Sequence, residues 1–232
     1  MRIVSYNIRK AVGLDWQRDP FRIIRVLATL DADVVALQEA DRRLGARPAV
    51  LPDSLLYTHT GLRIVNVVDG PSSGWHGNAL LLRDGWTVRG AERLSLPGIE
   101  PRGAVLADLS GPEGDVTVVG THLGLRRGCR QLQLAHLREA IADRAPHTII
   151  AGDMNEWSPR IGFDLIRDQF DLIAPGPSFH ASRLMAALDR FAVGTGVLCR
   201  ASGVVLDGEA RRASDHLPIW MDADIMGPSQ AA

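Results

Sequence analysis

The stretch Thr148-Ile149-Ile150-Ala151-Gly152-Asp153-Met154-Asn155-Glu156 joins a short apolar run to a group of polar residues. A β-branched run that ends in Gly, Asp and Asn predicts a buried strand whose carboxyl end presents polar side chains. Asp153 and Asn155 are two residues apart, so their side chains leave the same face if the backbone stays extended. A carboxylate beside a neutral amide suits a water molecule or a phosphate oxygen near a cation. The same pair also ends strands in ordinary turns, so its function depends on the rest of the chain.

The composition is that of one globular domain. With 232 residues, of which 46% are hydrophobic, the chain can bury a large core. We therefore expect a single domain over residues 1–226, followed by a small, polar and flexible tail at residues 227–232. The 26 lysines and arginines nearly balance the 27 acidic residues, which leaves a net charge of -1. This balance excludes a whole-protein basic field that would attract nucleic acid, but local basic patches remain open.

The sequence indicates neither secretion nor membrane insertion. Met1 leads directly into the strand-like Arg2–Tyr6 without the apolar region of a secretion signal, although a trimmed mature form would look the same. No apolar run approaches the roughly 18 residues of a membrane span. Cys129 and Cys199 lie far apart and form no Cys-x-x-Cys, which favours two reduced thiols. We expect a monomeric, cytoplasmic protein with no stable membrane association.

The first part of the chain predicts a strand, a helix and a second strand. Arg2–Tyr6 is a short β-type run that leads to Asn7, and residues 33–38 form another that leads to Glu39. Asp19 is a good helix start, because Asp caps a helix and the following proline is tolerated in the first turn. The buried face of this helix follows the i, i+3, i+4, i+7 spacing and contains Ile23, Val26, Leu27 and Leu30. This order allows Asn7 and Glu39 to be neighbours at one edge of a sheet.

The remainder of the chain predicts further strands and two more helices. Residues 40–77 look irregular, with a glycine-rich end at Gly70–Gly77, and long loops of this kind often border functional sites. A second exposed stretch follows residues 87–88 and continues to Arg102. Apolar runs predict strands over residues 78–82, 103–109, 115–120, 148–151, 171–173, 188–193, 204–206 and 217–221. Apolar faces predict one helix that buries Leu134, Leu137 and Ile141, and another that opens at Ser158-Pro159 and buries Ile161, Leu165 and Ile166.

These elements indicate an α/β fold. Strands outnumber helices, and the two kinds of element do not alternate strictly along the chain. We therefore expect an α/β sandwich, in which two mixed β-sheets pack face to face and the helices lie outside.

Polar residues gather at the ends of the predicted strands. They are Asn7, Glu39, His122, Asp153, Asn155, Asp189, Asp215 and His216. Carboxylates, amides and imidazoles without a thiolate form a hard-oxygen set, which suits magnesium or manganese better than zinc. The sequence also lacks a His-x-x-x-His pair. A divalent-metal site is therefore the predicted chemistry.

Seven short segments around these polar residues span nearly the whole chain: Ser5–Ile8, Leu37–Glu39, Gly77–Ala79, Thr121–Leu123, Gly152–Asn155, Leu188–Arg190 and Ser214–Pro218. In this order they resemble the endonuclease/exonuclease/phosphatase superfamily, which includes pancreatic-type deoxyribonucleases, abasic-site endonucleases, neutral sphingomyelinases and inositol-polyphosphate 5-phosphatases. Each segment alone is weak evidence, but seven in the family's order argue against a chance resemblance. The resemblance implies a four-layered α/β sandwich, in agreement with the pattern of strands and helices.

The resemblance implies a metal-dependent phosphohydrolase. Glu39 would be the principal ligand of Mg²⁺ or Mn²⁺, and Asn7 and Asp215 would help to bind the metal or to position a phosphate oxygen. His122 would donate to the scissile phosphate and stabilise the charge that develops on its oxygens. The implied reaction is in-line attack of water on phosphorus, with the metal stabilising the leaving alkoxide.

The same resemblance assigns the remaining residues to the attacking water and to the substrate. Asp153 would orient or deprotonate the water, and Asn155 would hold the water or the phosphate. Asp189 would orient His216 through a carboxylate–imidazole pair that fixes the tautomer and favours the charged ring. Whether Asp153 or His216 takes the proton stays open. Asn78 has two equal alternatives, substrate binding or a hydrogen bond to loop backbone.

The predicted substrate is a phosphate ester, for which nucleic acid is the leading candidate. Arg126 and Arg127 can contact flanking phosphates of an extended substrate, or can form a solvated helix start. Trp75 and His76, on the glycine-rich loop, can stack on a base, meet a lipid interface or pack inward. Thr121–Leu123 matches the deoxyribonuclease and sphingomyelinase branches alike. Gln38–Asp41 lacks the Gln-Glu-Thr-Lys of the abasic-site endonucleases, which argues against that dedicated role.

Three functional hypotheses follow. The leading one is a metal-dependent phosphodiesterase that acts as an endonuclease or exonuclease. The second is a phosphodiesterase or phosphatase that acts on phospholipids or on small phosphorylated metabolites. The third is a catalytically silent protein that binds a partner through the same cleft. It is disfavoured because every matched position keeps a competent residue type.

Overall fold

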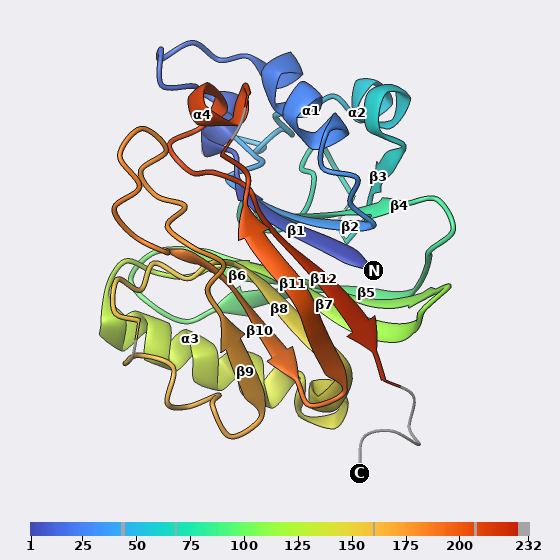
Figure 1. Ribbon diagram of the computed structural model, residues 1–232, viewed down its shortest axis with the longest axis vertical. Helices are drawn as coiled ribbons and strands as arrows, with labels where there is room; N and C mark the ends of the chain where they lie inside the picture. The colour runs from blue at the N-terminus through green and yellow to red at the C-terminus, as the bar shows by residue number, and fades with distance from the viewer. Residues whose placement is uncertain (43–44, 68, 160, 207, 227–232) are drawn as a thin grey trace.

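Two six-stranded β-sheets form the centre of the protein (Figure 1). The structure, a computed structural model, describes residues 1–226 apart from 43–44, 68, 160 and 207. The sheets pack face to face, and each contains both parallel and antiparallel neighbours. The α/β sandwich with two mixed sheets that the sequence predicted is therefore confirmed. The expected tail at residues 227–232 lies outside the described residues.

The first sheet has the strand order β11-β12-β1-β2-β4-β3. Its strands are β1 (Arg2–Asn7), β2 (Val34–Gln38), β3 (Leu62–Ile64), β4 (Ala79–Arg83), β11 (Val197–Val204) and β12 (Ile219–Ile225). The helices associated with it are η1 (Arg9–Ala11), α1 (Pro20–Ala28), α2 (Asp53–Thr60) and α4 (Ala210–Ala213). Helix α1 connects the parallel strands β1 and β2, in which Asn7 is paired with Gln38. Asn7 and Glu39 therefore lie at neighbouring strand ends, as predicted.

The second sheet has the strand order β5-β6-β7-β8-β10-β9. Its strands are β5 (Thr87–Leu96), β6 (Arg102–Gly111), β7 (Gly114–His122), β8 (Thr148–Asp153), β9 (Phe170–Ile173) and β10 (Asp189–Gly194). The parallel strands β7 and β8 are connected by α3 (Arg127–Ala140) and the 3-10 helix η2 (Ala142–His147). The predicted face of α3 is confirmed, because Leu134, Leu137 and Ile141 are buried.

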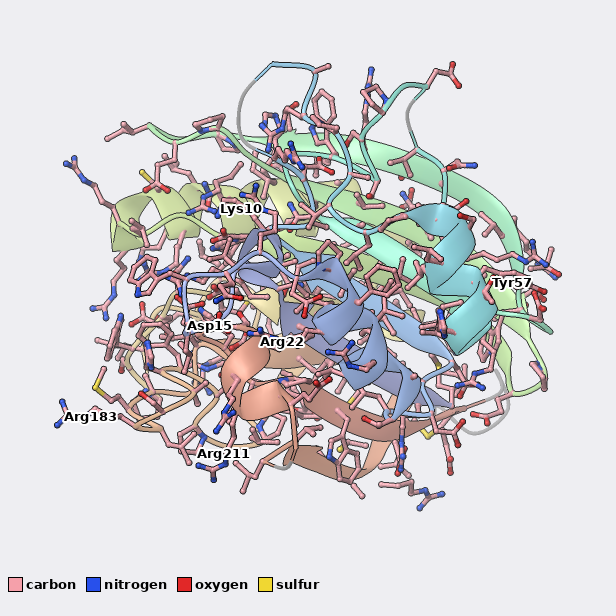
Figure 2. All side chains as sticks on the ribbon, turned by 90° about the horizontal axis from the view of Figure 1, so that it is seen from above. Lys10, Asp15, Arg22, Tyr57, Arg183 and Arg211 are labelled. Carbon is pink, nitrogen blue, oxygen red and sulfur yellow. The ribbon has the colours of Figure 1, made fainter. Side chains whose placement is uncertain are left out.

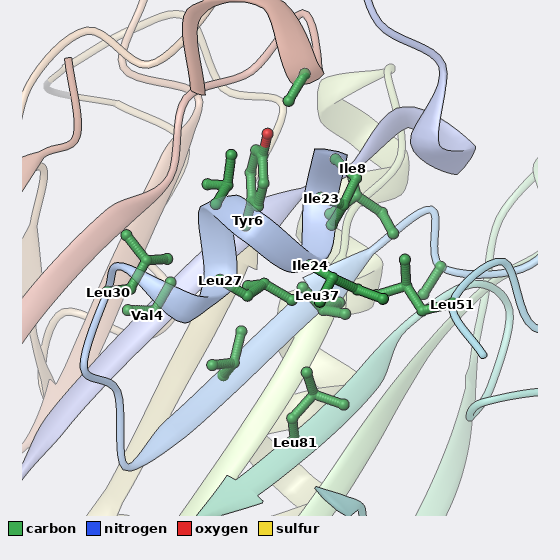
Figure 3. Close-up of a cluster of buried hydrophobic side chains, with 14 of the residues drawn as sticks. Val4, Tyr6, Ile8, Ile23, Ile24, Leu27, Leu30, Leu37, Leu51 and Leu81 are labelled. Atoms are coloured by element: carbon green, nitrogen blue, oxygen red, sulfur yellow. The ribbon is translucent and has the colours of Figure 1, made fainter. Parts of the chain in front are cut away.

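Three hydrophobic clusters hold the four layers of the sandwich together. The first joins α1 and α2 to the first sheet, and Figure 3 shows Ile23 and Leu27 of α1 together with Leu37 of β2. The second fills the space between the two sheets and includes Phe191. The third joins the second sheet to α3 through Leu134. Each sheet therefore buries both faces, which explains the nearly continuous apolar runs of its central strands.

Helix α1 forms for the reasons that its sequence indicates. The Asp19 carboxylate accepts a hydrogen bond from the backbone N–H of Arg22 at 3.1 Å, which caps the first turn. Pro20 occupies the first helical position, where its missing N–H costs nothing. The buried positions Ile23 and Leu27 lie on the predicted face.

Three predictions about elements are wrong. Residues 40–77 contain α2 and β3, and the stretch from 87 to 102 that was expected to be exposed loop contains β5. Strand β11 begins at Val197 and ends at Val204, ahead of the predicted residues 205–206. The side chains of β5 are largely exposed, so the strand lacks the alternation by which strands are recognised.

The helix predicted after Ser158 is also absent from the described residues, where 161–162 form a bend and 164–169 form turns. Ile161 and Leu165 are exposed, and only Ile166 of the predicted face is buried. Gly162 has a φ of 103°, which is incompatible with a continuous right-handed helix. Ser158 therefore caps only a local turn, in which the backbone N–H of Ile161 donates to the Ser158 hydroxyl at 3.2 Å.

Candidate active site

The alternation of side chains along four strands directs polar groups into the space between the sheets. Phe191 belongs to the hydrophobic cluster between the sheets, and Asp189 lies two residues before it on the same face of β10. The register pairs Asp153 of β8 with both His122 of β7 and Asp189 of β10. Asn7 occupies the corresponding end of β1 in the opposite sheet and donates to Asp153. The two sheets thus bring these residues together at one end of the sandwich.

Asp153 is the residue on which the site converges. Its Oδ2 atom accepts a hydrogen bond from Asn7 Nδ2 at 3.0 Å. The same atom lies 3.3 Å from His122 Nε2 and 3.6 Å from His216 Nε2. Its Oδ1 atom accepts from the backbone N–H of Asn155 at 3.0 Å. Because Asp153 is buried, these groups replace the water that an exposed carboxylate would bind.

The two histidines of the site have opposite electrostatic environments. Burial lowers the pKa of His216, but the nearby carboxylates of Asp189 and Asp153 outweigh it and raise the pKa to about 9. The Asp189 contact is direct, with 2.8 Å between His216 Nδ1 and Oδ2. Burial lowers the pKa of His122 to about 3, against the raising effect of Asp153. At neutral pH the structure therefore holds a charged and a neutral imidazole beside the same carboxylate.

Asn155 ties two site loops together. Its side-chain Nδ2 donates to the backbone carbonyl of Leu123 at 2.9 Å, and its backbone has a φ of 50°. The left-handed conformation is one that asparagine tolerates better than most residues. Asn155 thus fixes the loop after β8 against the loop after β7, close to the carboxylate of Asp153.

The two carboxylates predicted to bind metal lie beside cations of η1. Lys10 forms an ion pair with Glu39, and Arg9 Nε lies 3.4 Å from Asp215 Oδ2. Figure 2 views the molecule from above. It labels Lys10 within the outline of the molecule, whereas Arg183 and Arg211 extend outward at the margin. Glu39 has a φ of 54°, a left-handed conformation that turns the chain at the end of β2.

The residues present fit a divalent cation. Glu39 and Asp215 supply carboxylate oxygens. Within the described residues, Asn7 Oδ1 accepts one hydrogen bond, from the backbone of Arg9, which leaves it a second lone pair. The positions of Lys10 and Arg9 show that the carboxylates attract positive charge. Oxygen ligands of this kind are those that Mg²⁺ prefers.

A second group of possible ligands lies deeper. Among the described residues, one ligand atom each from Asp153, Asp189 and His216 lie within 4.8 Å of one another. All three side chains are buried. The His216 ring and Asp189 are already hydrogen-bonded to each other. This group is therefore better suited to holding a proton than to binding the metal in place of Glu39 and Asp215.

The remaining predicted site residues make structural contacts. Asn78 Nδ2 donates to the backbone carbonyls of Trp75 and Gly103 at 3.1 and 2.9 Å, which is the loop-backbone alternative, while its buried Oδ1 has no partner among the described residues. Arg127 donates to both carboxylate oxygens of Glu156, at 3.0 and 2.8 Å. Arg126 is exposed immediately before α3.

Glu156 is a residue of the site loop that the sequence did not single out. It is buried and receives Arg130 at 2.6 Å in addition to Arg127. Burial raises its pKa, but the hydrogen bonds from Arg127, from the backbone of Ser158 and from Arg130 outweigh this and lower the pKa to about 2. The signal in the sequence was the single acid that follows Asn155, near a cluster of arginines.

A pocket of about 300 Å³ opens beside these residues. Its lining includes Glu39 and His122 of the predicted site, and also Arg47, His76 and Arg102. The sequence did not predict the two arginines as site residues, because Arg47 lies in a loop without a periodic pattern and Arg102 ends a stretch that was expected to be exposed, although it opens β6. A larger hollow of about 840 Å³ contains none of the predicted site residues, so size alone does not locate the site.

Aromatic rings border the site on the side of His216. Phe179 lies 4.9 Å from the His216 ring, between ring centroids, and 6.0 Å from Trp157. Trp157 is 59% exposed. By contrast Trp75 donates to Ser95 through its indole N–H, so the indole that the sequence proposed for base stacking packs against β5.

Comparison with protein families places these observations in context. The sequence profile of the endonuclease/exonuclease/phosphatase family matches residues 4–216. The uncharacterized protein YbhP of Escherichia coli strain K12 is 30% identical over 241 residues, which cover 94% of each chain. No helix within the described residues is long and apolar enough to cross a membrane.

Solved structures have the same fold. The mannosyl-6-phosphatase Bt3783 of Bacteroides thetaiotaomicron superimposes with a TM-score of 0.76 at 16% identity, over 96% of this chain and 99% of that protein. D. rerio TDP2, complexed with a single-strand DNA product, superimposes with a TM-score of 0.72 at 16% identity, over 97% and 98% of the two chains. At these identities the likeness shows the shared fold alone.

Proposed function

This chain belongs to the endonuclease/exonuclease/phosphatase family, and on that premise we propose that it hydrolyses a phosphodiester bond with the help of Mg²⁺ or Mn²⁺. The observation that carries the proposal is the Asp153 carboxylate, which accepts from Asn7 and lies between the imidazoles of His122 and His216. A silent binding protein would have no need for this arrangement. The fold neighbours include a phosphatase and a protein bound to a DNA product, which supports phosphate ester chemistry in general.

A diester is proposed because of the segment Thr121–Leu123, which matches the branches of the family that cleave diesters. A nucleic acid is the leading substrate, and cleavage of a phosphomonoester is the alternative to be tested. The enzyme is proposed to be cytoplasmic and monomeric, in line with its nearly neutral charge and the free thiols of Cys129 and Cys199.

Glu39, Asn7 and Asp215 would hold the cation, whose positive charge would offset that of the phosphate oxygens and of the leaving alkoxide. Asp153 orients the attacking water and takes its proton, because donors from both sheets converge on its Oδ2 atom and fix its position. Asn155 holds the Asp153 loop in place through its backbone N–H. These assignments make Asp153 the base and leave the imidazoles as donors.

The two histidines stabilise charge on the phosphate. His216 is a positioning partner of Asp153 as well as a donor, and Asp189 fixes its tautomer by accepting from Nδ1. The neutral His122 ring presents its Nε2–H next to Asp153, where a phosphate oxygen can accept it. Preorganised donors of this kind act on the transition state without moving.

The test is turnover of bis-p-nitrophenyl phosphate, plasmid DNA and p-nitrophenyl phosphate, with magnesium, with manganese and with chelator. We expect diester cleavage that chelator abolishes and that His216→Ala lowers at least about 100-fold, the scale of losing a preorganised donor to the transition state. The matched control is His59→Ala, which removes an exposed histidine of α2.

Each outcome has a clear meaning. DNA cleavage would support the nuclease hypothesis, and monoester turnover alone would replace the diesterase with a phosphatase. Full activity in chelator would contradict the metal dependence. Inactivity on all three substrates, with both metals, would favour the silent binding protein.

A further inference from the structure

The pocket beside the catalytic residues has an end that the proposed reaction does not use. The cavity of about 300 Å³ reaches Glu39 and His122 on one side. Arg47 and His76, from the segment between β2 and β4, and Arg102, at the start of β6, also line it. This volume is at the lower end of the range of small-molecule sites, so it suits a compact group rather than a length of polymer.

The acidic residues of the pocket already have partners. Asp41 accepts from the Ser72 hydroxyl at 2.6 Å and from the Ser73 amide at 3.1 Å. Glu100 accepts from Arg102 Nε at 3.1 Å and from Nη2 at 2.8 Å, so Arg102 would meet a phosphate with its remaining nitrogen, Nη1. The third acid of the pocket is the proposed metal ligand Glu39, which pairs with Lys10. An anion that enters the pocket therefore meets carboxylates that already accept hydrogen bonds or pair with cations.

One donor of Arg47 has no partner among the residues that the structure describes. Within the described part of the chain its Nε is buried and has no hydrogen-bond partner. Gly77 lies beside both Arg47 and Glu39. A side-chain Cβ at Gly77 would be 3.5 Å from the Cα of Glu39 and 3.8 Å from Arg47 Nη2, so the Arg47 guanidinium is close to the proposed metal ligand Glu39. A planar guanidinium can bind two phosphate oxygens at once.

His76 adds a further donor. Arg47 Nη1 lies 3.3 Å from His76 Nδ1, and because a guanidinium can only donate, Nδ1 must accept. The neutral ring therefore carries its proton on Nε2. Burial, followed by the charge of Arg47, lowers the pKa of His76, which keeps the ring neutral at neutral pH.

We propose that this pocket binds a second phosphate group of the substrate, next to the phosphate that is hydrolysed, with Arg47 as its principal donor and His76 and Arg102 assisting. The substrate class is a compact phosphodiester that carries a further phosphate. The inference rests on the proposed function for the phosphate that is cleaved, but binding of the second phosphate can be measured without turnover.

Thymidine 3′,5′-bisphosphate and thymidine 5′-monophosphate are suitable probes, because they differ by one phosphate. Isothermal titration calorimetry with Mg²⁺, in a His216→Ala background that prevents hydrolysis, should show at least about tenfold tighter binding of the bisphosphate, the scale of one charge-assisted hydrogen bond. Arg47→Ala should abolish this preference, and Arg47→Lys should restore only part of it. Arg63→Ala removes an exposed arginine that is paired with Asp84, and should keep the preference.

Equal binding of the two probes would overturn the proposal, as would an unchanged preference in an Arg47→Ala variant whose circular dichroism is native. The kinetic counterpart compares dithymidine monophosphate with its 5′- and 3′-phosphorylated forms in the wild-type protein and in Arg47→Ala. The ratio of kcat/KM for the better phosphorylated form to that for the plain dinucleotide should fall about tenfold in Arg47→Ala. A kcat/KM that keeps rising with chain length would replace the compact substrate with an extended strand. A retained binding preference without any turnover would contradict the proposed function alone.

Discussion

At the scale of single residues, a buried charge is stable where it has several partners. Glu156 is the clearest case outside the catalytic group, since Arg127 and Arg130 both bind its carboxylate. Arg190 Nη2 donates to the backbone carbonyl of Glu156 at 2.8 Å, which connects the loop to β10. The site loop after β8 is therefore anchored by an ion-pair network directly beyond Asn155.

The stability that is lost when this network is removed should depend on pH. Glu156→Gln should lower the free energy of unfolding by about 3 kcal/mol at neutral pH, because it leaves the buried Arg130 without its anion. The folded pKa of about 2 is below the ordinary value of 4.5, so the stabilisation is complete above about pH 4.5 and is lost as the pH falls towards 2. Urea unfolding of both proteins over this pH range measures the difference.

Glu139→Gln is the control for Glu156→Gln, since Glu139 is exposed on α3. It should remain close to the wild type at every pH. A Glu156→Gln variant whose destabilisation does not diminish in acid would show that the loss comes from packing rather than from charge.

Single residues were predictable where a polar side chain ends a buried strand. Asn7, His122 and Asp153 all meet this condition. Arg47 does not, because it lies in a loop with a φ of 51° whose conformation depends on tertiary contacts. The sequence therefore predicted the residues that gather around Asp153 more completely than those of the pocket beside them.

At the scale of secondary-structure elements, α1 is the element for which local and tertiary signals agree. Its cap, its first-turn proline and its apolar face all coincide. Helix α2 shows the opposite, since it buries only Leu56 fully and presents no clear periodic face. A short helix with one buried position cannot be distinguished from a loop by its pattern alone.

The cap of α1 can be tested by two substitutions at one position. Asp19→Ala should lower the free energy of unfolding by about 1 kcal/mol, because the N–H of Arg22 loses its acceptor. Asp19→Asn keeps a capping oxygen and should cost less. Urea denaturation of the two variants separates the contribution of the capping hydrogen bond from that of the negative charge. Equal losses of unfolding free energy in both variants would assign the effect to the carboxylate charge.

At the scale of the whole molecule, the site depends on the packing of two sheets. Asn7 comes from the first sheet and Asp153 from the second, and neither sheet alone assembles the group. The sequence predicted the two sheets because strands outnumber helices without strict alternation. It did not predict the order of strands, which depends on pairings between distant segments.

Metal binding should stabilise the whole fold, because the proposed ligands come together only in the folded chain. At a cation concentration about 100 times the dissociation constant, binding adds about 2.7 kcal/mol to the free energy of unfolding. This corresponds to a rise in Tm of roughly 5–10 °C for a chain of this size. Differential scanning fluorimetry with Mg²⁺ or Mn²⁺ measures the rise. Glu39→Gln should abolish most of it, and an equal rise in that variant would assign the metal to other ligands.

Strand β5 has a consequence for the behaviour of the protein at high concentration. It is a ten-residue edge strand that pairs with β6 on one side only. Its exposed side chains include Arg89, Glu92 and Arg93, and its register shifts between Val88 and Gly90. Charged side chains and irregular register are the features that keep an open sheet edge from accepting a strand of another molecule. The strand that the sequence pattern failed to reveal is thus the one best protected against aggregation.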